Sequence, residues 1–177
     1  TVNGNEKELN AGDYKEDLTF SPEMMSIGGN SREIIIATTK SFAVKIIHED
    51  MERCFNMIIK NEPMPNGVLE ISKIFGTLHY DQATVNIEIY ENDYMDKYFE
   101  VDGDLKIGDV ILELPRKLEA GSPIEITLRL NNEGILDVKG LDKIGNREVN
   151  ARMETKGVMS EEEVEKLKQK SQGIAIL

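Results

Sequence analysis

Apolar and polar residues alternate over many short stretches of this 177-residue chain, and this pattern restricts its fold more than any other feature. In the stretch 124–130 (IEITLRL), four apolar residues are separated by Glu125, Thr127 and Arg129. The stretch 84–90 (TVNIEIY) repeats the arrangement. Because successive side chains of a β-strand point to opposite faces, a period of two predicts strands with one buried face. Such strands are typical of antiparallel sheets that have one side in water.

Similar runs follow one another between about residues 33 and 154, and stretches such as NEPMPNG, AGSP and NNEG separate them. Gly, Pro, Asn and Asp favour turns, so each of these stretches predicts a connection between strands. About eight strands at this spacing predict a mainly β protein, an antiparallel β-sandwich. Near the C-terminus, Ser160 and Glu163 form a capping box before an apolar–polar pattern of helical period. We therefore expect a short C-terminal α-helix after the sandwich.

The polarity and periodicity of the residues change along the chain and predict four segments. Residues 1–32 are polar and without periodicity, so we expect them to be poorly ordered or the remnant of something upstream. Residues 33–40 resemble a linker, and residues 41–156 hold the strand pattern of the sandwich. Residues 157–177 contain the start of the helix and a tail.

Composition excludes several classes of function. The formal net charge is −12, from 33 acidic and 21 basic side chains, and such a surface repels phosphate backbones, so we expect no nucleic-acid partner. No apolar run approaches the roughly 18 residues of a membrane helix, so we expect no membrane partner. The single cysteine excludes an internal disulfide and favours a reducing, cytoplasmic location.

Residues that could carry chemistry are few and isolated. His48 and His79 lie in different segments, and Cys54 sits in an apolar strand, where a buried small hydrophobe is the expected role. We find no nucleotide-binding glycine loop and no nucleophile elbow, so we expect no catalytic residue and no metal site. The acidic stretch Asp102–Asp109 has two interpretations, a calcium loop or a hairpin turn at Asp-Gly, and its spacing favours the turn.

Five stretches, in the same order along the chain, resemble motifs of one known family, the DnaK-type (seventy-kilodalton) heat-shock chaperones. They lie between residues 41 and 170 and match motifs of the family's substrate-binding domain and of the start of its lid. These stretches are SFAVKI (41–46), IIKNEPMP (58–65), KIFGTLHYDQATVNIEIYEND (73–93), NNEGILDVKGLDKIGNREV (131–149) and GVMSEEEVEKL (157–167).

This resemblance implies a molecular chaperone domain that holds short, extended apolar segments of unfolded polypeptides in a groove. Val85 falls at the family's central pocket, Leu78 and Ile47 fall at the arch over the bound peptide, and Gln82 falls where a side chain meets the peptide backbone. The full set of expected peptide-binding residues is Val44, Ile46, Ile47, Phe75, Gly76, Leu78, Gln82, Val85, Ile87 and Ile124.

The resemblance also implies partners. ATP would be the cofactor of the full-length protein only, bound by an N-terminal ATPase domain that works with co-chaperones. Ala37 stands where the family's linker has an acidic residue, which puts coupling to such a domain in question. The chain's own tail, Ile174–Leu177, is a further candidate for the groove because basic residues precede its apolar tip.

Two alternatives remain open from the residues alone. The chain fits an acidic β-sandwich adhesion or calcium/carbohydrate-binding module, with the stretch Asp102–Asp109 as its binding loop. The expected groove residues also fit the plain core of a sandwich, because an alternating strand buries the same side chains in both cases. If the groove exists, the acidic net charge predicts a preference for peptides with basic flanks.

Overall fold

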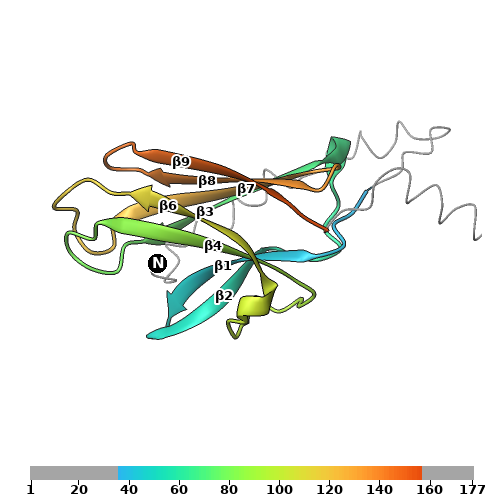
Figure 1. The fold of residues 1–177 in the computed structure, drawn as a ribbon, viewed down its shortest axis with the longest axis horizontal. Coiled ribbons are helices and arrows are strands. Elements are labelled where there is room, and N and C mark those ends of the chain that lie inside the picture. Colours follow the sequence, from blue (N-terminus) through green and yellow to red (C-terminus); the bar gives the residue numbers. More distant parts are fainter. Residues whose placement is uncertain (1–35, 157–177) are drawn as a thin grey trace, which may run out of the picture.

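The computed structural model of the chain describes residues 36–156, which form two antiparallel sheets packed face to face (Figure 1). One sheet has the strand order β5-β2-β1-β4-β6 and the other has the order β3-β7-β8-β9. The strands are β1 (Ser41–His48), β2 (Met51–Ile58), β3 (Val68–Gly76), β4 (Thr84–Asn92), β5 (Tyr98–Phe99), β6 (Lys106–Glu113), β7 (Pro123–Asn131), β8 (Ile135–Asp142) and β9 (Glu148–Glu154), with 3-10 turns η1 (Pro65–Gly67) and η2 (Gly103–Leu105).

The predicted antiparallel β-sandwich is thus confirmed. The predicted C-terminal helix and the tail lie outside the described residues, as does most of the segment before the first strand. Within residues 36–156, no helix has the length and apolar character needed to span a bilayer.

The inner faces of the two sheets form one core. In β7 and β8 every second side chain is buried, as their alternation predicted. Gly140 on β8 belongs to this inner face, and its lack of a side chain lets Ile87 of the opposite sheet approach closely. The largest side chains buried to below 2% exposure are Phe42, Phe55, Phe75, Ile46, Ile58, Met64, Ile87, Ile89, Leu112, Ile124, Ile126 and Leu128.

Strands β1 and β4 differ from the alternating prediction because both of their faces are largely buried. The segment 93–105, which includes β5 and η2, covers part of the outer face of the five-stranded sheet. This segment carries apolar residues among its acidic ones, and these apolar residues cover the outer face of β1 and β4. The alternation within β1 and β4 does not predict this cover. The resulting outer cluster consists of Ala43, Cys54, Tyr90 and Phe99, with Val101 and Leu105 packed against it.

Glu88 on β4, which alternation assigns to the outer face, is buried there in an ion-pair cluster. Its side chain is 11% exposed, it contacts the ammonium group of Lys45, and its Oε1 lies 3.0 Å from Nζ of Lys106. Burial opposes ionisation of this carboxyl group, but the two ammonium groups outweigh burial and hold the pKa of Glu88 below its ordinary value. Burial also opposes the charge on Lys45, yet Glu88 holds the pKa of Lys45 above its ordinary value.

The prediction of a hairpin at Asp102–Gly103 is wrong. These residues begin η2, where the Asp102 carboxylate accepts a hydrogen bond from the Asp104 N–H at 3.0 Å. The turn joins β5 to β6, and these strands lie at opposite edges of the five-stranded sheet, so they do not pair. An Asp-Gly pair bends the chain in either case, and the pairing of the flanking strands is decided by their packing.

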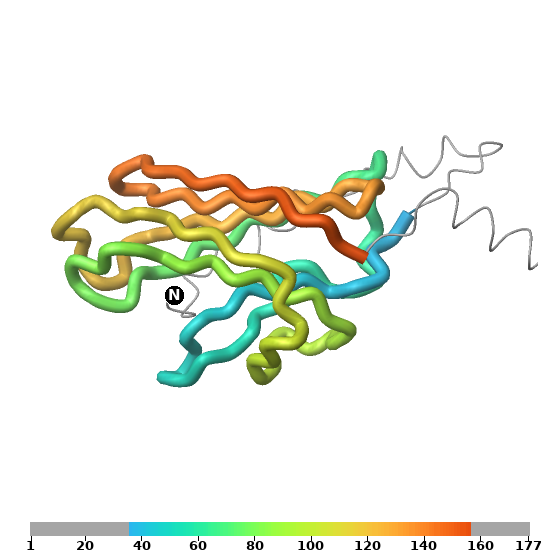
Figure 2. The backbone as a smooth tube through the Cα atoms, in the orientation of Figure 1, coloured from blue at the N-terminus to red at the C-terminus, as the bar shows by residue number. Residues whose placement is uncertain are grey.

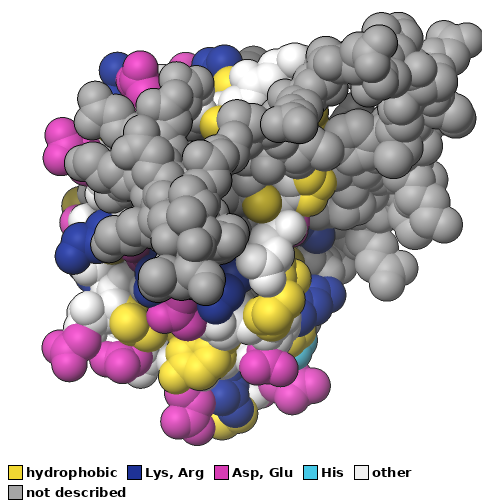
Figure 3. All heavy atoms as spheres, turned by 90° about the vertical axis from the view of Figure 1, so that its right-hand side faces the viewer, with side chains coloured by type: hydrophobic (Ala, Val, Ile, Leu, Met, Phe, Trp, Pro, Cys, Tyr) yellow, Lys and Arg dark blue, Asp and Glu magenta, His cyan; other side chains and the backbone are white. Residues whose placement is uncertain are grey.

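The chain enters and leaves the sandwich at the same end. The Thr39 hydroxyl donates to the Lys156 carbonyl at 3.3 Å, and the Lys156 N–H donates to the Glu91 carboxylate at 3.1 and 3.2 Å. Figure 2 shows the first and last described residues meeting there. In Figure 3, which looks at this end, apolar side chains lie among acidic ones where grey atoms leave the surface visible.

We predict that Glu88→Gln lowers the free energy of unfolding by about 1–3 kcal/mol, because Lys45 would lose the carboxylate that compensates its burial. Urea denaturation at neutral pH measures the change. Glu70→Gln is the matched control: Glu70 lies 3.7 Å from Arg129 with both side chains more than half exposed (58% and 54%). We expect that substitution to change stability by no more than about 0.5 kcal/mol.

The difference between wild type and Glu88→Gln should depend on pH. Because folding lowers the pKa of Glu88, its ion pairs stabilise the fold above the unfolded pKa of about 4.3 and lose this effect as pH falls through the folded pKa. The stabilities of the two proteins should therefore converge as the pH is lowered below the unfolded pKa of Glu88. Equal stability of the two proteins at neutral pH, or an undiminished difference in acid, contradicts this explanation.

We predict that Gly140→Ala costs about 1–3 kcal/mol of stability through overpacking. An added Cβ would lie 2.5 Å from Cδ1 of Ile87 and 3.3 Å from Cγ1 of Val149, inside the core. Gly103→Ala is the control, since no atom lies within 4 Å of a Cβ added there. Thermal unfolding compares the two, and equal melting temperatures would show that the core accommodates the methyl group.

Candidate functional site

Six of the ten expected peptide-binding residues meet between the sheets. All six belong to a single hydrophobic cluster, and each is at most 1% exposed. The structure thus brings these side chains together, in the core and not on an open surface. They are Val44 and Ile46 from β1, Phe75 from β3, Val85 and Ile87 from β4, and Ile124 from β7.

Ile47 and Leu78, the two expected halves of the arch, are both half-buried. Ile47 pairs with Glu52 across the β1–β2 hairpin and, being one residue from Ile46, points to the other face of the sheet. It therefore lies outside the cluster of core residues. Leu78 lies in the β3–β4 loop (77–83). Figure 2 shows this loop at the end of the molecule opposite to the first and last described residues.

Gln82 holds the β3–β4 loop together. Its Oε1 accepts a hydrogen bond from the Leu78 N–H at 2.8 Å, and its Nε2 donates to the Thr84 carbonyl at 2.8 Å. This amide is 6% exposed, so its bonds within the loop fix the position of Leu78. Gly76, the tenth expected residue, lies just before the loop, where an added Cβ would come within 3.1 Å of the Gly121 Cα.

A second set of bonds joins the β3–β4 loop to the β6–β7 loop (114–122). The Asp81 carboxylate accepts from the Lys117 N–H at 2.7 Å and from Nε and Nη2 of Arg116, both at 3.1 Å. The Lys117 N–H and the Arg116 guanidinium hold the pKa of Asp81 below its ordinary value. The backbone N–H of Thr77 also donates to the Ser122 carbonyl at 3.0 Å. The loop that carries Leu78 is therefore a fixed part of the sandwich.

A row of aromatic rings leads from the core toward the surface beside the expected site, and the sequence did not reveal it. Phe75 and Phe55 meet edge to face with centroids 5.9 Å apart, and Phe55 lies 5.4 Å from Tyr98. Tyr98 stacks on His48 at 4.3 Å and an interplanar angle of 11°. We call these four residues the aromatic row. The two phenylalanines are buried, whereas Tyr98 and His48 are half-buried.

One signal could have placed His48 in this row, whereas none could have placed Tyr98. The alternation of Val44 and Ile46 on β1 continues to His48, which therefore shares their face. Tyr98 follows the turn-rich stretch after β4 and pairs with Phe55 as part of β5. A strand of only two residues has no recognisable period, so the pairing that places Tyr98 depends on contacts distant in sequence.

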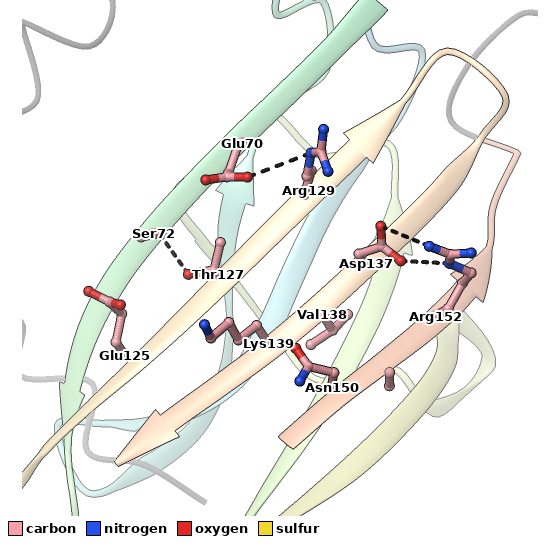
Figure 4. Close-up of a pocket in the computed structure, with 11 residues that line it drawn as sticks. Glu70, Ser72, Glu125, Thr127, Arg129, Asp137, Val138, Lys139, Asn150 and Arg152 are labelled. Carbon is pink, nitrogen blue, oxygen red and sulfur yellow. Dashed lines mark hydrogen bonds and ion pairs between the residues drawn. The ribbon is translucent and has the colours of Figure 1, made fainter. Parts of the chain in front are cut away.

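A shallow depression on the outer face of the four-stranded sheet is a second candidate, and Figure 4 shows its lining. One row across the four strands consists of Glu70, Arg129, Asp137 and Arg152, which alternate in charge. Arg152 Nε lies 2.7 Å from the Asp137 carboxylate, and Glu70 pairs with Arg129. These groups satisfy one another, so the depression resembles the solvated face of a sheet.

The described residues offer little for catalysis or for metal binding. Burial raises the pKa of the Cys54 thiol to about 12, which removes its nucleophilic thiolate at neutral pH. No group of three or more histidine, cysteine or acidic residues within residues 36–156 could hold a metal ion. In the stretch Asp102–Asp109, for which a calcium loop was the less favoured interpretation, Asp102 caps η2 and the Asp109 carboxylate lies 3.5 Å from Nζ of Lys106.

Comparison with known proteins identifies the family of this chain. The family model described as Hsp70 protein matches residues 26–176, which include every described strand. The chain is 27% identical over 146 residues to the chaperone protein DnaK of Anaplasma marginale (strain St. Maries), an alignment that covers 81% of this chain. The chain spans about a fifth (21%) of that relative's length. From the family match we conclude that this chain belongs to the Hsp70 family.

Proposed function

We propose that this chain is the peptide-binding part of an Hsp70 chaperone and holds short, extended apolar segments of unfolded polypeptides. The observation that carries the proposal is the convergence of the expected groove residues with the aromatic row at one end of the sandwich. Phe75 belongs to both sets, so the row continues the core cluster toward the surface. A deep apolar site of this kind binds many sequences through side-chain burial and backbone pairing.

Binding at Val85 requires a local movement. Val85 is 0% exposed, so a ligand side chain reaches it only after neighbouring side chains have moved aside. The bonds at Gln82 and Asp81 fix the β3–β4 loop, whereas the β1–β2 hairpin ends in a two-residue turn, Glu49–Asp50, at the edge of the molecule. The hairpin is thus the element that we expect to move. Burial of one leucine side chain would then contribute about 1.5–3 kcal/mol.

Further parts of the full-length protein would control peptide binding by this chain. An ATPase domain outside this chain would control the affinity for peptide, and this chain itself would have no enzymatic activity. Co-chaperones would act on the full-length protein in the cytoplasm. The chain's own tail, Ile174–Leu177, lies outside the described residues and stays a candidate occupant of the site.

We predict that labelled leucine-rich peptides bind this chain saturably with micromolar affinity and that Val85→Phe weakens binding at least about tenfold, the equivalent of 1.4 kcal/mol. The added ring would fill the space that a ligand side chain needs. Val138→Phe is the matched control, because Val138 is a core valine (1% exposed) on β8 of the other sheet. Fluorescence anisotropy measures affinity, and thermal unfolding shows that both variants fold.

A second pair of variants avoids the core. Leu78→Ala removes a half-buried side chain from the β3–β4 loop and should weaken peptide binding several-fold, by about 1 kcal/mol. Leu141→Ala makes the same change at a half-buried position of β8 and should leave affinity unchanged. If no apolar peptide binds, or if the two variants weaken binding equally, the proposed function or its site is wrong.

A further inference from the structure

Three buried polar side chains hold the segment 93–97, which leads from β4 to β5. They are Ser41 on β1, Asn56 on β2 and Asn92 at the end of β4, with exposures of 0%, 4% and 2%. Because a buried polar group costs free energy unless it is hydrogen-bonded, such side chains have a definite set of partners. We call these three residues the polar network.

Asn56 bonds to the segment at three places. Its Nδ2 donates to the Asp96 carbonyl at 2.8 Å and to the Tyr94 carbonyl at 3.3 Å, and its backbone N–H donates to the Lys97 carbonyl at 2.9 Å. Its Oδ1 accepts a hydrogen bond from Nδ2 of Asn92 at 2.9 Å. Donor and acceptor of this side-chain amide are both used, which fixes its orientation.

Asn92 and Ser41 fix the start of the segment at Tyr94. The Tyr94 N–H donates to Oδ1 of Asn92 at 3.0 Å, and the Ser41 hydroxyl donates to the Tyr94 carbonyl at 2.6 Å. The Ser41 oxygen also accepts from the Lys60 N–H at 2.8 Å. The polar network thus holds residues that belong to no strand.

The segment places Tyr98 in the aromatic row. Tyr98 begins β5, which pairs with β2 at two positions, and so short a ladder contributes little to fixing the ring. The ring stacks on His48, the last residue of β1. His48 precedes the turn Glu49–Asp50, so the stack joins the segment to the β1–β2 hairpin, the element that we expect to move.

From these contacts we infer that Ser41, Asn56 and Asn92 are positioning residues of the proposed peptide site. They act through Tyr98: a fixed Tyr98 keeps its stack with His48 and thereby restrains the opening of the hairpin. This inference rests on the proposed function and assigns to it a set of residues that controls how fast a peptide enters and leaves.

The restraint has a kinetic consequence. A bound peptide leaves when the hairpin opens, and a free peptide enters in the same way, so a hairpin released from Tyr98 accelerates both steps. A purely structural role has a different effect. Partial unfolding would lower the fraction of chains that bind and would leave both rate constants of the remaining chains unchanged.

The test follows a labelled leucine-rich peptide and the 177-residue chain by stopped-flow fluorescence. We expect Asn92→Ala to raise the dissociation rate constant about three- to tenfold and the association rate constant about twofold or more. Ser41→Ala removes a single hydroxyl group, should raise both by a smaller factor, and takes the place of Asn92→Ala if that variant does not fold. Asn150→Ala is the matched control on β9 of the other sheet, where the amide donates to the exposed Glu148 carboxylate at 2.8 Å. It should change neither rate constant.

A double variant tests the route through Tyr98. Tyr98→Ala alone should accelerate dissociation at least as much as Asn92→Ala does, and the two substitutions together should cause no further acceleration. The ring-proton resonances of His48 should also shift in Asn92→Ala toward their positions in Tyr98→Ala, because the stack is weakened in one variant and absent in the other.

Thermal unfolding identifies the variants that are folded. Unchanged or lower rate constants in the folded network variants, or effects that multiply in the double variant, overturn the inference and leave the proposed function intact, because the wild-type chain still binds peptide. If the wild-type chain binds no apolar peptide saturably, the proposed function fails and the inference with it.

Discussion

Burial of both faces of β1 and β4 is the constraint on which the rest of this structure depends. On the inner side these strands supply Val44, Ile46, Val85 and Ile87 to the core shared with the four-stranded sheet. On the outer side, the segment 93–105 and the ion pairs of Glu88 exclude water from them. Two central strands held on both faces form a rigid base, and the β1–β2 hairpin and the β3–β4 loop extend from it. At the end that carries this hairpin and this loop, the tightly packed core would fix the positions of the side chains in the proposed binding site.

The alternation of residues predicted the sandwich because it reports which face of each strand is buried. It succeeded best for β7 and β8, which follow one another with a short turn and have a water-exposed outer face. It failed for the segment 93–105, where the Asp102–Gly103 turn joins strands at opposite edges of a sheet, because edge pairing depends on contacts distant in sequence. Six of the ten residues that the resemblance assigns to a groove converge in the core between the sheets, where alternation alone also places them. Neither approach identified the aromatic row, since His48 and Tyr98 meet only through the pairing of β2 with β5.

The charge beside the aromatic row has the opposite sign to the net charge of the chain. The chain carries a net charge of −12, yet Nζ of Lys73 and Nζ of Lys97 lie 5.4 and 5.6 Å from the centroid of the Phe55 ring. An inward-facing lysine at an edge strand discourages pairing with a further strand, and this is a structural role of Lys73 on β3.

We propose that an apolar peptide binds at the end of the sandwich where the aromatic row meets the β3–β4 loop. Nuclear magnetic resonance of the isotopically labelled chain tests it most directly, by following backbone amide shifts during titration with an unlabelled leucine-rich peptide. We expect the shift changes to concentrate in residues 46–55, 75–85 and 97–99, and the outer face of the four-stranded sheet to be unaffected. Shift changes concentrated around Arg129, Asp137 and Arg152 in the outer depression, or none anywhere at saturating peptide, would contradict it.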